Sequence, residues 1–111
     1  MDVNRQQCDG AMDSVMQVGD IRAKMEQFGA VVAECDAHDL DAMRAAAQTS
    51  HKDKPLIILA HSNPFHAMPI LEERFPRLHY VRFKSEDERA RYNTEIAKSL
   101  NVDPVDYGGS H

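Results

Sequence analysis

Histidine and cysteine are the residues of this chain that could most readily bind a transition metal. The 111-residue sequence holds six histidines and two cysteines. No two histidines show H-x-x-x-H spacing, no histidine has a cysteine neighbour at ligand spacing, and Cys8 and Cys35 form no C-x-x-C pair. A small metal-binding α/β module built on the histidines therefore ranks last among the hypotheses. We expect both thiols to be free and structural.

Two other polar residues follow predicted strands, where α/β proteins often carry out chemistry. Asn4 comes directly after Met1-Asp2-Val3, and His61 directly after an apolar run at 56–60. In open parallel sheets, ligands bind at the carboxyl ends of strands. Taken without further context, Asn4 would be a turn residue, and His61 would make a structural hydrogen bond.

The first half of the chain predicts the elements that would position these residues. Asp20 is a predicted N-cap for a helix over 21–28, with Gly29 as its stop. A β-branched run at 30–35 indicates a buried strand, and apolar spacing from residue 40 indicates a helix that ends near residue 50. The run at 56–60 is apolar on both faces, as a covered parallel strand must be. The alternation predicts an α/β fold, a parallel sheet with flanking helices.

The second half is less regular. Three prolines between residues 62 and 77 predict a loop with one short helical turn at 70–74. The segment 79–83 could be a short edge strand or an extended arm. Ser85 and Glu88 form a capping box that predicts a helix continuing to about Leu100.

Bulk composition predicts one globular domain over residues 1–107 and a flexible tail at 108–111. The net charge of −5, with 13 basic residues scattered among 18 acidic ones, argues against a nucleic-acid partner. No secretory apolar segment or long apolar run is visible, so we expect a cytoplasmic protein with no membrane partner.

Several short motifs resemble the thiamine-diphosphate (ThDP) binding domain of transketolases, in the family's order. The family pattern has D-x-N followed by D-G, then V-M, F-G, D-G-H-D and a D-K-P strand that ends in A-H. The matching stretches here are Asp2-Val3-Asn4, Asp9-Gly10, Val15-Met16, Phe28-Gly29, Asp36-Ala37-His38-Asp39 and Asp53–His61. The match is strong jointly over residues 2–61 and loose beyond residue 62.

The resemblance implies a cofactor role for the loop after Asn4. The family's asparagine ligates the Mg²⁺ or Ca²⁺ of the ThDP diphosphate, and a backbone carbonyl two residues later, here that of Gln6, is a second ligand; both oxygens suit a hard cation. The family also uses an aspartate from an upstream G-D-G segment, which has no counterpart in this sequence. We therefore expect an incomplete ThDP-binding fold that does not bind ThDP and Mg²⁺ alone.

The sequence departs from the family near the expected substrate site. Phe65-His66-Ala67 stands where the family commonly has G-K-G, and Ala37 replaces the glycine of D-G-H-D. The stretch from Pro76 to Tyr80 resembles the P-x-W-H segment of split transketolases, which implies that His79 contacts the substrate. A variant loop of this kind would suit an unusual phosphosugar.

The resemblance leaves two hypotheses for function. The first is a component of a ThDP-dependent transketolase, which transfers a two-carbon ketol unit between sugar phosphates and needs a partner segment or subunit with the pyrimidine-binding domain. Such a component is expected to be inactive as an isolated chain. The second is a noncatalytic truncated domain that serves only subunit interaction. Unpaired sheet edges would also permit a homodimer.

Overall fold

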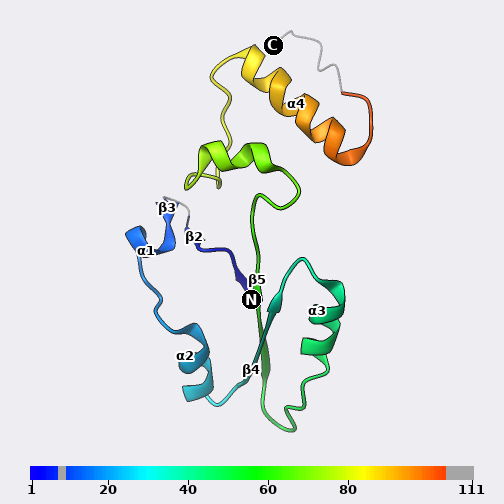
Figure 1. The fold of residues 1–111 in the computed structure, drawn as a ribbon. Coiled ribbons are helices and arrows are strands. Elements are labelled where there is room, and N and C mark those ends of the chain that lie inside the picture. The colour runs from blue at the N-terminus through cyan, green and yellow to red at the C-terminus, as the bar shows by residue number, and fades with distance from the viewer. Residues whose placement is uncertain (8–9, 105–111) are drawn as a thin grey trace.

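The computed structural model describes residues 1–7 and 10–104; Cys8, Asp9 and the expected tail at 108–111 lie outside the described residues. In the described residues every strand lies before residue 62, and the elements after it are helical (Figure 1). In chain order they are β1 (Asp2–Val3), β2 (Gln6–Gln7), β3 (Gly10–Ala11), α1 (Met12–Val15), α2 (Ile21–Gln27), β4 (Val31–Asp36), α3 (Leu40–Ala47), β5 (Leu56–His61), the 3-10 helix η1 (Pro69–Arg74) and α4 (Glu86–Leu100).

The main sheet has three parallel strands in the order β1-β5-β4. Val31 pairs with Leu56 and Asp36 with His61, so β4 and β5 are in register along their whole length. β5 is central because β1 pairs with its other edge, where Asp2 lies opposite Ala60. The central position explains why β5 is apolar on both faces. The predicted α/β fold with a parallel sheet is confirmed, and the sheet is small.

The two helices of this layer lie on opposite faces of the sheet (Figure 1). From β1 the chain crosses to β4 at the far edge, and from β4 it returns to the central β5. Because both crossovers are expected to be right-handed and run in opposite directions, α2 and α3 must cover opposite faces. Both helices pack against β4, and α3 also contacts β5.

Local sequence signals set the ends of these helices. The Asp20 side chain accepts the Ala23 N–H at 2.9 Å and caps α2. At the other end Gly29 has φ of 90°, and the Ala30 N–H bonds back to the Met25 carbonyl at 3.1 Å. A residue with a side chain would be strained in this left-handed conformation. The predicted start of α2 and its stop at Gly29 are both confirmed.

The segment after Asn4 is more structured than the loop expected from the sequence. β2 and β3 form a two-stranded antiparallel pair in which Gln6 lies opposite Ala11. The Met12 N–H then bonds to the Arg5 carbonyl at 3.0 Å, and the short helix α1 follows. Arg5 itself has φ of 60°, so the backbone turns sharply as it leaves β1.

The C-terminal part consists of η1, α4 and the segment between them. Ser85 accepts the Glu88 N–H at 3.2 Å, as the capping box predicts, and α4 ends at Leu100. The predicted helical turn is present as η1. Residues 79–83 form no strand, so the predicted short edge strand is wrong, and the segment begins with a bend at His79 and Tyr80.

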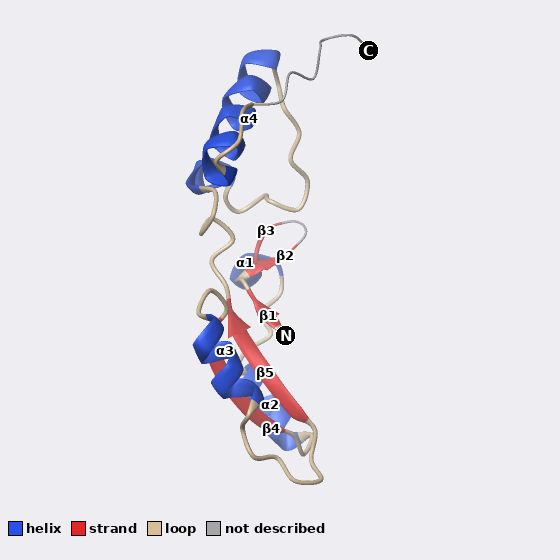
Figure 2. Ribbon diagram, turned by 90° about the vertical axis from the view of Figure 1, so that its right-hand side faces the viewer, coloured by secondary structure: helices blue, strands red, loops and turns tan. Residues whose placement is uncertain are grey.

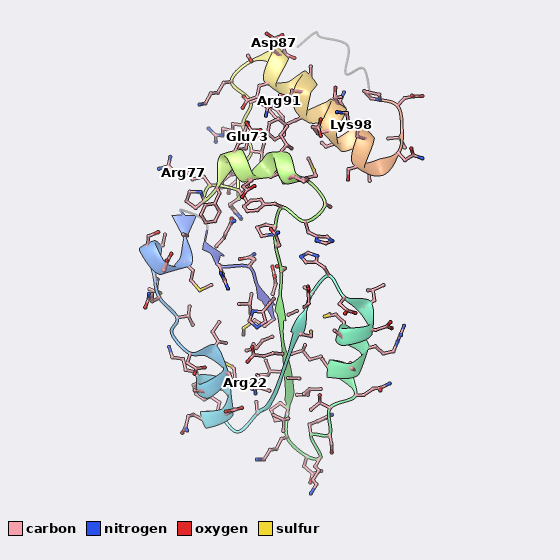
Figure 3. All side chains as sticks on the ribbon, viewed as in Figure 1. Arg22, Glu73, Arg77, Asp87, Arg91 and Lys98 are labelled. Atoms are coloured by element: carbon pink, nitrogen blue, oxygen red, sulfur yellow. The ribbon has the colours of Figure 1, made fainter. Side chains whose placement is uncertain are left out.

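Arg74 joins η1 to α4. Its guanidinium donates to the Tyr92 hydroxyl at 2.7 Å and to Glu88 at 2.6 Å, and it also lies over the Tyr92 and Phe83 rings. Figure 3 shows a second link, in which Glu73 on η1 and Arg91 on α4 point toward each other and form an ion pair. A planar cation that can stack and donate several bonds suits such a junction.

The molecule is elongated, with the α/β layer at one end and the η1–α4 part at the other (Figure 2). It extends 56 × 32 × 22 Å, with a radius of gyration of 18.5 Å. A compact chain of this size would have a value of about 13 Å. Buried hydrophobic residues are few among the described residues: Ala30, Val32, Ala46, Leu59, Tyr92 and Ala97. The single domain over 1–107 stays a prediction.

Candidate functional site

The carboxyl ends of the three parallel strands border an open cavity of about 800 Å³. The chain leaves β1 through Asn4, β4 through the loop containing His38, and β5 through Ser62. The cavity is lined by Val3, Asn4, Arg5, Gln6, Glu34, Cys35, Asp36, His38, His61, Ser62, Asn63, Pro64, Phe65, His66 and Phe75. We call it the carboxyl-edge cavity; it lies where open α/β sheets commonly bind ligands.

Asn4 is held at the rim by hydrogen bonds on both ends of its amide. Its Oδ1 accepts the Gln6 N–H at 3.0 Å, which forms a local turn, and its Nδ2 donates to Asp2 Oδ2 at 3.0 Å. The other Asp2 oxygen accepts the Ser62 hydroxyl from the end of β5. The expected turn role of Asn4 is therefore real, and its orientation is set by β1 and β5 together.

The residues at this rim supply only part of a site for a cation and a diphosphate. Asn4 Oδ1 retains one lone pair beside its bond to Gln6, whereas the nearby carboxylate of Asp2 is already engaged by Asn4 and Ser62. Among residues 1–7 and 10–104, no group of three or more His, Cys, Asp or Glu side chains is arranged to hold a metal. A hard cation that bridges phosphates usually takes one or two carboxylates from protein. On their own, these residues do not form a complete site for a divalent cation and the diphosphate that it holds.

The Gln6 side chain carries a further sign of an unfilled interaction. Its Nε2 is buried and has no hydrogen-bond partner within the described part of the chain. Leaving a buried donor unpaired costs about 1–3 kcal/mol. An acceptor on a neighbouring segment or on a bound group would remove that cost.

Glu34, on β4, bridges the side chains of Arg22 and His61 at the edge of the cavity. Its Oε1 accepts from Arg22 Nε at 2.5 Å, and its Oε2 lies 2.8 Å from His61 Nε2. Figure 3 places Arg22 on α2, beside the sheet. The Arg22 hydrogen bond, with a smaller share from His61, holds the pKa of Glu34 below its ordinary value, and the same bond raises the pKa of Arg22. The structural hydrogen bond expected for His61 is confirmed.

His38 and His66 meet across the mouth of the cavity. His38 Nε2 accepts the backbone N–H of Asn63 at 2.8 Å. The His66 ring stacks on the His38 ring, with 4.0 Å between centroids and 12° between planes. Each histidine lies in a stretch that the sequence comparison with transketolases singled out, but their pairing was not predicted, because they are 28 positions apart and match no ligand spacing. The sequence signal that could have indicated their proximity is that each follows the end of a predicted strand.

His79 makes its described contacts away from the carboxyl-edge cavity. It lies in the segment between η1 and α4, and its ring packs edge-on against Tyr80 at 4.6 Å. It is not among the residues that line the carboxyl-edge cavity. Asn4 and Gln6 do line that cavity, so two of the three expected site residues are brought together. Their roles, and that of His79, stay predictions.

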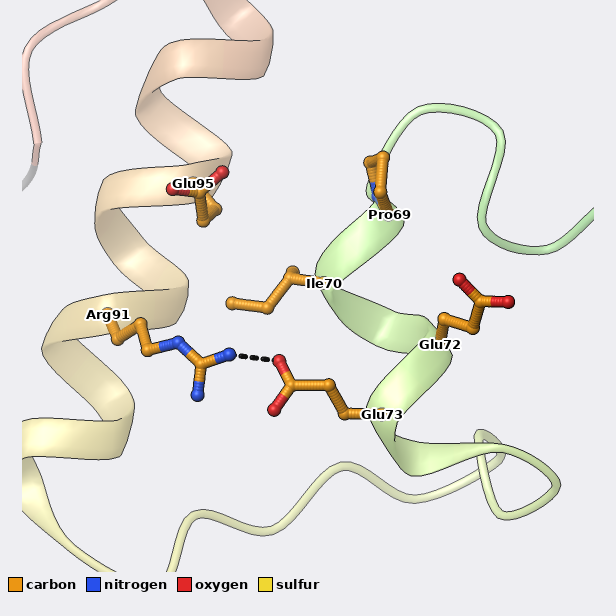
Figure 4. Close-up of a pocket in the computed structure, with 6 residues that line it drawn as sticks. All are labelled: Pro69, Ile70, Glu72, Glu73, Arg91 and Glu95. Atoms are coloured by element: carbon orange, nitrogen blue, oxygen red, sulfur yellow. Dashed lines mark hydrogen bonds and ion pairs between the residues drawn. The ribbon is translucent and has the colours of Figure 1, made fainter.

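A second hollow of about 500 Å³ lies between η1 and α4 (Figure 4). Its lining residues are Pro69, Ile70, Glu72, Glu73, Arg91 and Glu95. Arg91 is paired with Glu73 and Glu95 with Lys98, so most of the charged groups of this hollow are already in ion pairs. In the described part of the chain, no helix is both long and apolar enough to cross a membrane.

The comparisons with known proteins give one informative similarity. The chain is 31% identical over 90 residues to y4mO of Sinorhizobium fredii, an uncharacterized transketolase family protein. The match covers 78% of this chain and 32% of that protein, so the chain spans about a third of the length of its relative. No protein-family model and no solved structure matches. The similarity supports a relationship between this chain and the transketolase family.

Proposed function

We propose that this chain is part of a ThDP-dependent transketolase that transfers a two-carbon ketol unit between sugar phosphates. The observation that supports this proposal is the position of Asn4, which lies at the end of β1 on the rim of the carboxyl-edge cavity. Asn4 is also the residue that the family resemblance marks as a cation ligand. Position, residue type and relationship therefore converge on the same rim.

In this proposal the chain contributes binding and orientation, because the covalent chemistry of such enzymes belongs to the cofactor. Asn4 Oδ1 and the Gln6 carbonyl offer oxygen ligands on one side of the cation. The turn between them and the Asp2–Ser62 bond keep the Asn4 amide in place. His79 would contact the sugar phosphate.

The proposal also requires a complementary segment or subunit. The Asp2 carboxylate beside Asn4 already accepts hydrogen bonds from Asn4 and Ser62, and Gln6 Nε2 is left without an acceptor among the described residues. A second segment that carries an acidic ligand, together with a pyrimidine-binding domain, would supply both needs. We therefore propose that the isolated chain is inactive.

Calorimetry can test this proposal by titrating ThDP and Mg²⁺ into the chain alone and into its complex with the complementary segment. We expect no binding by the chain alone and binding by the complex. Asn4→Ala should abolish retention in the complex, because the ligand oxygen is lost, whereas Gln17→Ala on the exposed segment before α2 should leave it intact. Micromolar binding by the isolated chain would contradict the partial site, and unchanged retention by Asn4→Ala would remove Asn4 from it. A complex that forms but never binds ThDP would favour the noncatalytic alternative.

A further inference from the structure

A hydrogen bond to the His38 imidazole joins the loop that follows β4 to the loop that follows β5. His38 lies two residues beyond the end of β4, and Asn63 lies two residues beyond the end of β5. The Asn63 backbone N–H donates to His38 Nε2 at 2.8 Å. Both side chains are exposed, so protons from solvent can reach the ring. This bond ties the segment that leads away from the sheet to the loop before α3.

The direction of this hydrogen bond constrains the protonation of His38. A ring nitrogen accepts a hydrogen bond only when it carries no proton, whereas an imidazolium can only donate. The observed bond therefore requires neutral His38 with its proton on Nδ1. Protonation of Nε2 would place two N–H groups against each other, and the bond would be lost.

His66 adds a second titratable ring on the same segment as Asn63. Its backbone N–H bonds to the Asn63 carbonyl at 3.0 Å, so its ring and the Asn63 amide belong to one turn. Because the two rings stack at 4.0 Å, placing a positive charge on both is unfavourable. Charging the pair would repel the turn from His38 as well as break the bond.

The carboxylates near His38 and His66 already have other hydrogen-bond or ion-pair partners. Asp36 Oδ1 accepts the His38 backbone N–H at 2.8 Å, and the Asp39 carboxylate caps α3. Glu34 is shared between Arg22 on α2 and His61 at the end of β5. Arg5, which lines the cavity from the loop after β1, is a further positive charge. No carboxylate in the described contacts is paired with the His38 or His66 ring.

We propose that His38, His66 and the Asn63 amide form a proton-sensitive latch that opens when the imidazoles become charged. The latch is closed while the His38 ring is neutral, and it opens when the imidazoles take up protons. All three residues line the carboxyl-edge cavity, so opening changes the wall of that cavity. A consequence of this change for cofactor binding rests on the proposed function, whereas the latch itself does not.

NMR spectroscopy of the full chain without cofactor tests the latch directly. We expect the Asn63 amide proton to shift along the same pH curve as the His38 ring protons. After correction for the intrinsic exchange rate, its protection should fall by roughly 2- to 10-fold, as expected for the loss of one hydrogen bond. An Asn63 amide that does not respond while His38 titrates would overturn the proposal.

Matched variants separate the latch from a general effect of pH. His38→Ala should remove the response and leave Asn63 exposed to exchange at every pH. His66→Ala should keep the bond but move its opening to higher pH, because the second charge is gone. His51→Ala, an exposed histidine in the turn before β5, should respond like the parent. A response that persists in His38→Ala, or one that His51→Ala removes, would contradict the assignment, and the parent titration decides the question if a variant does not fold.

Discussion

At the scale of single residues, the cavity is shaped by side chains that each serve two neighbours. The Asp2 carboxylate accepts hydrogen bonds from Asn4 and Ser62, and the Glu34 carboxylate pairs with both Arg22 and His61. These links connect β1 with β5 and α2 with the sheet, so polar contacts supplement a small apolar core. The contacts are exposed to solvent, which limits what each one contributes to the free energy of unfolding.

The lowered pKa of Glu34 makes the stability of the folded chain fall as the pH falls. Its pKa is lowered in the folded chain, mainly by Arg22, so its contribution is present above the ordinary glutamate pKa and is lost as the pH falls through the lower folded pKa. We predict that thermal unfolding followed by circular dichroism shows a fall in Tm below about pH 4.5. Glu34→Gln should flatten that fall, whereas Glu72→Gln at the other end of the molecule should retain it. An equal slope in parent and Glu34→Gln would contradict the role of Glu34.

At the scale of elements, the two acidic residues of Asp36-Ala37-His38-Asp39 have local structural roles. Asp36 Oδ1 accepts the His38 N–H, and Asp39 Oδ1 accepts the N–H groups of Asp41 and Ala42, each at 2.9 Å. The motif thus turns the chain from β4 into α3. The same turn presents His38 to the cavity, so the cap and the latch share one loop.

The N-cap of α3 yields a prediction about stability. Asp39→Ala should lower the free energy of unfolding by about 1 kcal/mol, because two backbone donors lose their acceptor. Asp39→Asn keeps a capping oxygen and should have a smaller effect. Asp41→Ala, which removes an exposed partner of Arg44, is the matched control and should change stability little. Urea unfolding monitored by circular dichroism measures all three, and equal losses for Asp39→Ala and Asp41→Ala would rule out capping as the cause.

At the scale of the whole molecule, the two ends of the chain are held by separate sets of contacts. The sheet layer is held by strand pairing and by α2 and α3, whereas η1 and α4 are joined through Arg74 and through the Glu73–Arg91 pair. Large apolar side chains remain exposed at both ends, including Phe28, Leu40, Tyr80 and Leu100.

The elongated shape can be measured in solution. Small-angle X-ray scattering of the monomer should give a radius of gyration close to 18.5 Å rather than the value of about 13 Å for a compact chain. A dilution series separates this property from self-association, which would raise the value with concentration. A concentration-independent value near 13 Å would show that the η1–α4 part folds back onto the sheet layer.

Much of the local structure could be predicted from the sequence, because its causes are local. Asp20 and Ser85 mark the starts of α2 and α4, Gly29 marks the stop of α2, and the run at 56–60 marks the central strand. Each signal acts within a few residues through a cap, a left-handed backbone position or an apolar pattern. The segment 79–83 stayed ambiguous, because an extended stretch becomes a strand only when another strand pairs with it.

The sequence by itself determined the order of the elements from α2 to β5, the helix α4, the parallel α/β class and the position of Asn4 at a strand end. Only the tertiary structure decided that β5 is central, that His38 and His66 stack, and that Asn4 and Gln6 share a cavity while His79 does not line it. The physical reason is that strand order and cavity lining depend on contacts between residues far apart in the chain. No local spacing encodes the 2.8 Å bond between Asn63 and His38, which exists because β4 and β5 end side by side.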